Sequence, residues 1–372
     1  MLLAAGRASG LPMYYLTDLG DLPGDGDYSL GHGINQVGNV VGESNSAAPM
    51  QRGFLWTPLG GLQNLGMLPG DVRSVAAAIN NLNQIAGTSF AAGGASEDHA
   101  FVWSPGSGFV SLGLLPGATF GDSLAWGINN LGQVVGTSGL GAVPGSHAFL
   151  WSPSTGMMDL GAPQDPFNVN FSLARDINDA GQVVGLGFTD NPQYSALLWT
   201  APGRFINLGV LPGFTTASDA LAINQLGHVV GMSGTGITPT DITRAFIWTP
   251  NTGMINLGTL PNGSLRSVAY DINDFDVVVG DSTSVAFAWT KQEGMVDLNT
   301  RIVGNSGLRL KLTSATAIND FGQIAGTGVT AAGNPHAFLL TPVPEPSPVV
   351  LATTGLMVFA RTVCRRRAIT AG

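Results

Sequence analysis

The sequence has a single cysteine, very few lysines and few charged residues of any kind. Because that cysteine, Cys364, lies near the C-terminus, the body of the chain has no disulfide, no thiolate metal site and no thiol nucleophile. Charged residues make up 10% of the 372 residues, against about 25% in an ordinary soluble domain. The net charge is −9, and four of the fifteen basic residues lie in the last dozen positions. Such an acidic body repels phosphate backbones, which excludes nucleic acid as a partner.

Helical patterning is also missing. No segment of the body has the 3.6-residue apolar period of an amphipathic helix. Glycine is abundant, at 53 residues, but it lacks the three-residue period of collagen. With 44% hydrophobic residues the chain can form a buried core. These features together predict an all-β fold.

An internal repeat of 45 to 49 residues runs through the chain. A glycine lies eight positions after the Ile-Asn pair of each copy, and a segment such as HAFVW (residues 99–103) lies about 22 positions after it. The pattern predicts four short strands per copy, which in the second copy are 74–79, 84–88, 99–104 and 109–112. The Ile-Asn pairs begin at Ile34, Ile79, Ile128, Ile177, Ile223, Ile272 and Ile318.

The period and the number of copies predict a seven-bladed β-propeller with four-stranded blades. A lone fourth-strand motif at residues 14–20 precedes the first copy, whereas the last copy stops after its third strand, near Pro342. The N-terminal strand is therefore expected to complete the last blade and leave no open edge. The aromatic column that ends in Trp is expected to form the blade cores. Asn-x-x-Gly turns are expected to connect the first and second strands.

Several copies resemble the bacterial extracellular HAF-repeat family. The resemblance rests on HAFVWSP, HAFLWSP and HAFLLTP, together with INDAGQVVG and LGLLPG, and it covers residues 13–342. It implies a location outside the cytoplasm, and it implies no reaction, because that family is defined by its repeat. The histidines of the motif, His99, His147 and His336, are interpreted as structural partners at the start of the third strand.

The C-terminal residues 343–372 resemble a PEP-CTERM sorting signal of Gram-negative bacteria. Its parts are Pro344, Glu345 and Pro346, then the apolar run 349–360, then Arg365, Arg366 and Arg367. The resemblance implies processing by an exosortase, an association with exopolysaccharide, and transient membrane anchoring at the cell surface, outer membrane or extracellular matrix. The apolar run has 12 residues, shorter than the about 20 of a comfortable span. The alternative is a disordered C-terminus. Residues 1–12 are interpreted as the remnant of an export signal or as disordered.

The candidate ligand site is a variable column, two positions before each Ile-Asn pair. It contains His32, Trp126, Arg175 and Tyr270, while the neighbouring columns are small and nearly uniform. In a propeller the first strands line the central channel, so this column is expected to form a ring at the channel mouth. Asp176 and Asp271, one position before the isoleucine, are expected to add hydrogen-bond acceptors. The alternative is that these side chains pack between blades.

These observations predict a non-catalytic, exported and monomeric propeller that binds polysaccharide, surface glycans or another matrix component through one face. The variable loops between the fourth and first strands and between the second and third strands favour that face. Two alternatives stay open. One is a hydrolase or lyase that acts on glycans, and the other is a purely structural matrix protein. No cofactor and no metal site are predicted, because the acidic loop with Asp21, Asp25 and Asp27 lacks the spacing of an EF-hand.

Overall fold

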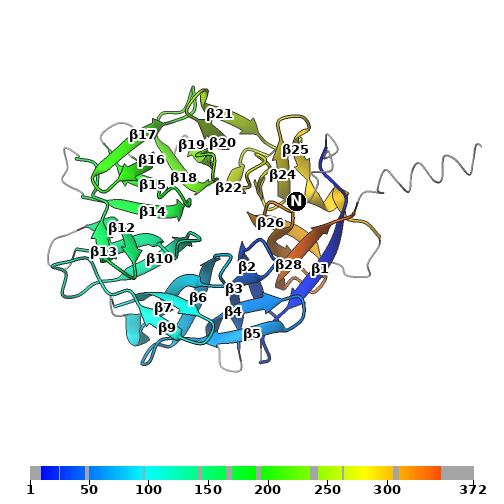
Figure 1. Cartoon of the computed structure of the whole chain (residues 1–372). Helices are drawn as coiled ribbons and strands as arrows, with labels where there is room; N and C mark the ends of the chain where they lie inside the picture. The colour runs from blue at the N-terminus through cyan, green and yellow to red at the C-terminus, as the bar shows by residue number, and fades with distance from the viewer. Residues whose placement is uncertain are drawn as a thin grey trace, which may run out of the picture.

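The computed structural model shows an all-β protein whose sheets surround a common centre (Figure 1). The structure describes residues 10–344 except 25, 47–49, 95–96, 141–144, 165–169, 190–193, 235–241, 262–263 and 305–309. These residues contain no α-helix and only two short 3-10 segments, η1 (Ala92–Gly94) and η2 (Leu298–Arg301). Within this part of the chain, no helix has the length and apolar character that a membrane span requires. The expected all-β class is confirmed.

The strands follow the repeat in chain order. The N-terminal strand and the first three copies form β1 (Tyr14–Gly20), β2 (Ser29–Ile34), β3 (Val40–Asn45), β4 (Gln51–Thr57), β5 (Gly61–Gly66), β6 (Arg73–Ile79), β7 (Ile85–Phe90), β8 (His99–Ser104), β9 (Gly108–Ser111), β10 (Ser123–Ile128), β11 (Val134–Gly139), β12 (Ser146–Ser152) and β13 (Gly156–Asp159). The strands of the second copy agree with the predicted ones to within two residues at each end.

The remaining copies repeat the same order. They form β14 (Ser172–Ile177), β15 (Val183–Phe188), β16 (Tyr194–Ala201), β17 (Arg204–Gly209), β18 (Ala217–Ile223), β19 (Val229–Gly234), β20 (Thr243–Thr249), β21 (Gly253–Gly258), β22 (Val268–Ile272), β23 (Val278–Asp281), β24 (Ala286–Thr290), β25 (Gly294–Asp297), β26 (Lys311–Ile318), β27 (Ile324–Val329) and β28 (Pro335–Pro342).

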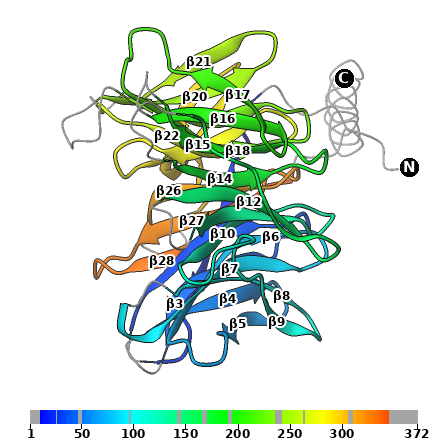
Figure 2. The same cartoon turned by 90° about the vertical axis from the view of Figure 1, so that its left-hand side faces the viewer.

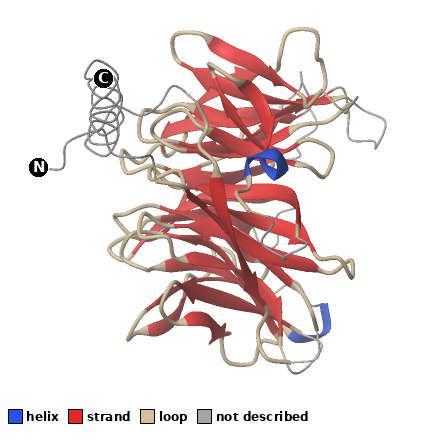
Figure 3. Ribbon diagram, turned by 90° about the vertical axis from the view of Figure 1, so that its right-hand side faces the viewer, coloured by secondary structure: helices blue, strands red, loops and turns tan. Residues whose placement is uncertain are grey.

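The strands of each copy pair in chain order as antiparallel sheets. Five described sheets have four strands. A sixth has eight, because one parallel residue pair, Tyr194 and Ala217, joins the copy β14–β17 to the copy β18–β21. Figures 2 and 3 show the sheets from two sides, with connections at both faces. We call the face with the connections from the first to the second strands the turn face, and the opposite one the loop face.

The two ends of the described chain meet in one sheet. Strand β1 pairs antiparallel with β28, with Tyr14 opposite Pro342, so the N-terminal strand is the fourth strand beside β26, β27 and β28. This is the pairing that the phase of the repeat predicts. The first strands also contact one another from copy to copy, and β26 of the last copy contacts β2 of the first. The N-terminal strand therefore covers the edge of β28.

The buried centre of each sheet differs from the expected one. The position two before the Trp column is fully buried in every copy: Phe54, Phe101, Phe149, Leu197, Phe246, Phe287 and Phe338. In the Trp column only Trp103, Trp199 and Leu340 are buried, while Trp56, Trp151, Trp248 and Trp289 are half-buried. The Trp column is therefore part of the core in three copies, and in the other four it packs against the core while staying partly exposed. In those copies the indole ring lies at the edge of the core beside the fourth strand, as Trp151 does opposite Met157.

The glycine column has a steric cause. In the third copy, a Cβ atom on Gly136 would lie 1.9 Å from the backbone oxygen of Leu124 in the first strand. That distance excludes any side chain, because real Cβ atoms do not approach within 3.0 Å of a neighbouring atom. The same close approach occurs in each of the other copies. The repeat therefore needs glycine here so that the first strand can bend toward the second.

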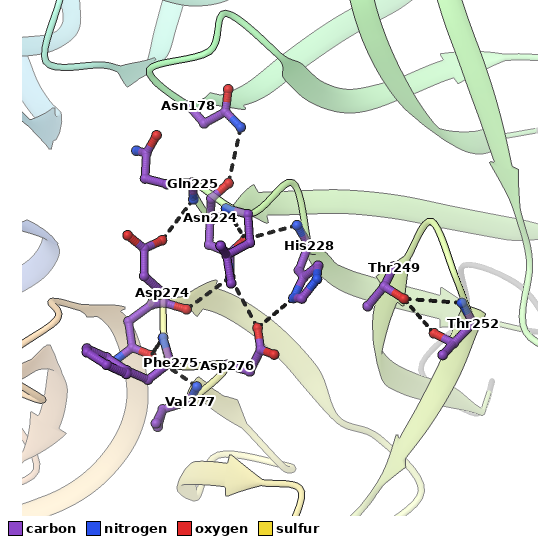
Figure 4. A network of polar contacts seen from close by, with 12 residues as sticks. Asn178, Asn224, Gln225, His228, Thr249, Thr252, Asp274, Phe275, Asp276 and Val277 are labelled. Atoms are coloured by element: carbon purple, nitrogen blue, oxygen red, sulfur yellow. Dashed lines mark hydrogen bonds and ion pairs between the residues drawn. The ribbon is translucent and has the colours of Figure 1, made fainter. Parts of the chain in front are cut away.

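The turns between the first and second strands join neighbouring copies. Asn80 Nδ2 donates to the carbonyl of Asn129 at 3.0 Å, and the equivalent bonds run from copy to copy. Figure 4 shows two steps, from Asn178 to Asn224 and from Asn224 to the next turn. The last step, from Asn319 to the carbonyl of Asn35, closes the cycle. The donors, in order, are Asn35, Asn80, Asn129, Asn178, Asn224, Asn273 and Asn319.

Candidate functional site

The variable column of the sequence lies at a β-bulge in every copy. In each first strand the pairing register shifts across this residue, as at Trp126 between Ala125 and Gly127. Bulges redirect a side chain away from the regular alternation of a strand. All members are half-buried. We call this set the bulge column: His32, Ala77, Trp126, Arg175, Leu221, Tyr270 and Thr316.

Bulge-column residues contact the neighbouring copies. The Arg175 guanidinium carbon lies 5.1 Å from the centre of the Trp126 ring, in the preceding copy. Thr316 donates to the carbonyl of Gly31 at 2.8 Å and so joins the last copy to the first. The column therefore follows the inner strands around the centre. Two predicted site residues, Trp126 and Arg175, lie side by side.

Arg175 also forms an ion pair that sequence reasoning missed. Its Nη2 lies 3.0 Å from Oδ2 of Asp219, a side chain that is 4% exposed. Burial raises the pKa of Asp219, while the Arg175 charge and hydrogen bond oppose the rise. Among the described residues, Asp219 Oδ1 and Arg175 Nε have no hydrogen-bond partner. The sequence did contain a signal, because four positions before each isoleucine the other copies have Leu30, Val75, Leu124, Leu173, Val268 and Ser314.

Two further carboxylates contact the bulge column. Glu43 Oε1 lies 3.9 Å from Nε2 of His32, and Tyr270 donates to Asp281 at 3.0 Å. Glu43 and Asp281 occupy the same position in two copies, directly after the repeat glycine. Burial lowers the pKa of His32 to about 4, so this imidazole is neutral at pH 7. Burial, and then the charge of Asp281, raise the pKa of Tyr270, so the phenol stays protonated.

Asp176 and Asp271 connect copies through the backbone. Asp176 accepts from the N–H of Ile177 at 2.8 Å and from that of Ile223, in the next copy, at 3.0 Å. Asp271 does the same with Ile272 and Ile318, both at 2.8 Å. Burial raises the pKa of Asp176 to about 6. Burial is also the largest cause of the raised pKa of Asp271, which is about 8. A ligand role for either carboxylate stays a prediction.

The histidines of the repeat motif have partners, as a structural role requires. His147 Nδ1 lies 2.8 Å from Asp159, and its Nε2 lies 2.8 Å from Asn170. His336 bonds Asp18 in the same way, at 3.0 Å, and also Asp27. His99 bonds Asp71 instead, at 3.2 Å.

Among the described residues, one group has metal-ligand atoms close enough together to hold a cation. Ligand atoms of Asp21, Asp27 and His336 lie within 4.8 Å of one another. The imidazole of His336 is, however, already bonded on both nitrogens by Asp18 and Asp27. Asp25 of the same loop lies outside the described residues. These contacts resemble the pair of His147 with Asp159 and do not need an ion.

A small cavity lies on the turn face, where the first strands end at the isoleucines of the repeat. Its volume is about 140 Å³, and its lining is mostly polar. Residues such as Asn80, Asn129, Asp179 and Gln225 border it, with isoleucines of the repeat behind them. Their side chains form hydrogen bonds between neighbouring turns. For example, the N–H of Asn130 donates to Asp179 Oδ1 at 2.8 Å. We interpret the lining as part of the closing network of the fold.

The fold and the site together define an all-β repeat protein of the propeller-like class. No family model matches the chain, and no curated protein matches it. Solved structures do match. One is the extracellular domain of a protein described as a one-component system from B. thetaiotaomicron, at 10% identity and a TM-score of 0.53, covering 90% of this chain and 40% of that one. This chain therefore spans less than half of that structure. At this identity the likeness concerns the fold alone.

Two further solved structures resemble the chain less closely. TolB from Acinetobacter baumannii has 11% identity and a TM-score of 0.44, covering 87% of this chain and 65% of that one. A gluconolactonase from Xanthomonas campestris has 10% identity and a TM-score of 0.40, covering 91% and 99%.

Proposed function

We propose that the protein is an exported, non-catalytic and monomeric seven-bladed propeller that binds polysaccharide or another surface or matrix component at the bulge column. The observation that carries the proposal is the contact of Trp126 with Arg175, which is paired with buried Asp219. An aromatic ring packs on the C–H face of a sugar ring. A guanidinium and a carboxylate beside it hydrogen-bond to hydroxyl groups, and bonds to charged groups are the stronger ones.

The number of blades rests on hydrogen-bond cycles. The asparagine cycle passes through seven turns and returns to Asn35. A second cycle joins the residues after those asparagines, since Asp320 donates its N–H to Gln36 and Gln36 donates to Asn81. Each copy therefore bonds the next one twice. Seven four-stranded blades, the last completed by β1, account for both cycles.

The location rests on sequence resemblance. We assign the repeat to the HAF type and residues 343–372 to a PEP-CTERM-like tail that an exosortase processes. Pro344 is exposed, and Glu345, Pro346 and Arg365–Arg367 lie outside the described residues. The test is mass spectrometry of the mature protein from a host with and without an exosortase. A C-terminus that is the same in both hosts would contradict this assignment.

Binding can be tested with a glycan array on the full chain and two variants. Trp126→Ala removes the aromatic face, and the matched variant Leu221→Ala changes another member of the same column. We expect Trp126→Ala to weaken binding at least tenfold, and Leu221→Ala to leave it within twofold. Melting temperatures of both variants report whether the fold is intact. Equal loss in the two variants would contradict a site at Trp126.

The alternative function is a hydrolase or lyase acting on glycans. The buried carboxylates Asp176 and Asp271 favour it, because a carboxyl group with a raised pKa can act as a general acid. Release of reducing ends or unsaturated sugars from polysaccharides, abolished by Asp271→Asn, would establish the enzyme. If the array and the turnover assays both stay negative, the purely structural role in a matrix is the remaining hypothesis.

A further inference from the structure

The tips of the turns on the turn face are apolar and exposed. The third residue of each turn is a large hydrophobic residue in six copies, with fractional exposures of 58 to 66%. In the copy that starts at Ile177 the position is Ala180, which is also exposed. We call the six side chains the apolar crown: Val37, Leu82, Leu131, Leu226, Phe275 and Phe321.

The folding of the turn does not require these side chains. The conformation is set by the asparagine that starts the turn and by the residue that ends it, whose φ is positive, as in Gly322 at +75°. Turn positions are usually filled by Gly, Pro, Asn, Asp or Ser. A large apolar side chain that stays exposed at the same position in six copies instead indicates an interaction surface.

The backbone N–H groups at the turn tips already have hydrogen-bond partners inside the protein. Around Leu82, the N–H groups of Leu82 and Gln84 donate to Asn80 Oδ1 at 3.0 and 2.9 Å. The N–H of Asn81 donates to Asn130 Oδ1 in the next copy. The N–H of Asn83 donates to the Asn80 carbonyl at 3.1 Å, so each N–H from residue 81 to residue 84 has a partner inside the protein.

The turn that carries Phe321 has the same pattern. The N–H groups of Phe321 and Gln323 donate to Asn319 Oδ1, and that of Gly322 donates to the Asn319 carbonyl. A polar group that enters an apolar layer without a partner costs several kcal/mol, and this internal bonding removes that cost for the N–H groups of both turns.

We propose that the apolar crown inserts into the surface of a lipid bilayer, with the loop face turned away from the lipid. The crown residues come from six copies arranged around the centre (Figure 1). One added strand or helix can contact only part of such a ring, whereas a flat surface contacts all of it. The proposal does not depend on the ligand proposed for the bulge column.

Electrostatic repulsion disfavours a second copy of this chain as the partner that covers the apolar crown. The same turns contain Asp179, Asp274, Asp276 and Asp320, and these carboxylates would face those of the second copy. Among the described residues, Arg204 and Lys291 add positive charge near this face, and Arg301 there is already paired with Glu293. A zwitterionic lipid surface avoids this repulsion.

The chain also leaves the described fold on the turn face. Strand β28 ends at Pro342, which lies against Gly322 of the turn that carries Phe321. The next residue, Val343, donates its N–H to the carbonyl of Met13. The sequence continues with the apolar run 349–360 and the arginine cluster. The apolar crown is therefore on the same face of the fold as the point where the chain continues toward these residues.

The test is flotation of the full chain with phosphatidylcholine vesicles. Neutral lipid keeps Arg365–Arg367 from dominating the binding, as they would on anionic vesicles. The test variant is Leu82→Ser with Phe321→Ser, on the crown. The matched control is Phe120→Ser with Leu265→Ser, which removes the same residue types, 53 and 55% exposed, from the loop face. We expect the crown variant to lower the partition coefficient at least tenfold and the control to change it less than twofold.

Three results would overturn the proposal. Partition of the crown variant equal to that of the wild-type chain would show that the crown does not bind lipid. Stronger partition of the crown variant would show that the crown holds residues 345–372 of its own chain and hides them from lipid. A wild-type dimer that becomes a monomer in the crown variant, measured by sedimentation, would show that a second copy covers the crown.

Discussion

Asn319 Nδ2 donates to the backbone carbonyl of Asn35 at 3.0 Å, across 284 residues of sequence. Both side chains are buried. The bond joins the last turn of the repeat to the first, and so it depends on the closure of the whole ring of copies.

This bond gives a first prediction on stability. Asn319→Ala removes the donor and also the Oδ1 acceptor for the N–H groups of Phe321 and Gln323. We expect the free energy of unfolding to fall by about 2–3 kcal/mol, because these buried groups lose their partners. Asn319→Asp keeps the acceptor and should lose less. Urea denaturation of the three proteins measures the order of their free energies of unfolding. Equal stability of wild type and Asn319→Ala would contradict a stabilising role of the Asn319 hydrogen bonds.

A second prediction concerns the N-terminal strand. Deletion of residues 1–20 removes β1 and exposes the edge of β28, and it also removes Tyr14, which is 1% exposed. We expect a sharp fall in melting temperature, since a buried aromatic side chain alone contributes about 3–5 kcal/mol. Deletion of residues 1–9 is the control and should leave the melting temperature unchanged. If both truncated proteins melt together with the full chain, β1 does not stabilise the fold.

A third prediction concerns the glycine column. Gly136→Ala places a Cβ 1.9 Å from the backbone oxygen of Leu124, and neither backbone segment can move without breaking the sheet. We expect a loss of more than about 3 kcal/mol. Gly139→Ala, in the same strand β11, is the control, because its Cβ would have no neighbour closer than 3.6 Å. Thermal melts of both variants measure the difference, and a stable Gly136→Ala protein would contradict the steric explanation.

A fourth prediction concerns pH. The pKa of Asp271 is about 8 in the folded protein, raised mainly by burial from its ordinary value of 3.8. Between these values the folded state holds a proton that the unfolded chain has lost, so the stability contributed by Asp271 falls as the pH rises from about 4 to about 8. The melting temperature of Asp271→Asn should therefore fall less than that of the wild-type protein between pH 5 and pH 8.

The two histidines with raised pKa values, His147 and His336, also lose stability as the pH rises through their folded pKa. Both are unchanged in Asp271→Asn, so their contribution cancels in the difference between the two melting curves. Parallel curves would contradict a titration of Asp271 in this range.

Much of the local structure could be predicted because it depends on neighbours in sequence. The alternation of residues and the Asn-x-x-Gly turns predicted the strands of each copy, and the expected positive φ occurs at the turn ends, including Asn83 at 59° and Asp276 at 57°. The phase of the repeat predicted that β1 pairs with the last copy. The depth of burial was harder to predict, because Trp56 and Trp199 occupy the same position and only the second is buried.

The sequence by itself determined the period, the strand order and the residues of the variable column. Only the tertiary structure decided that this column lies at bulges and that Asp219 pairs with Arg175, because those contacts form between strands of different copies. It also decided that Leu82 and Phe321 stay exposed while Phe101 and Phe338 are buried. Residue type alone cannot distinguish such pairs, because burial depends on which face of which copy packs against the next.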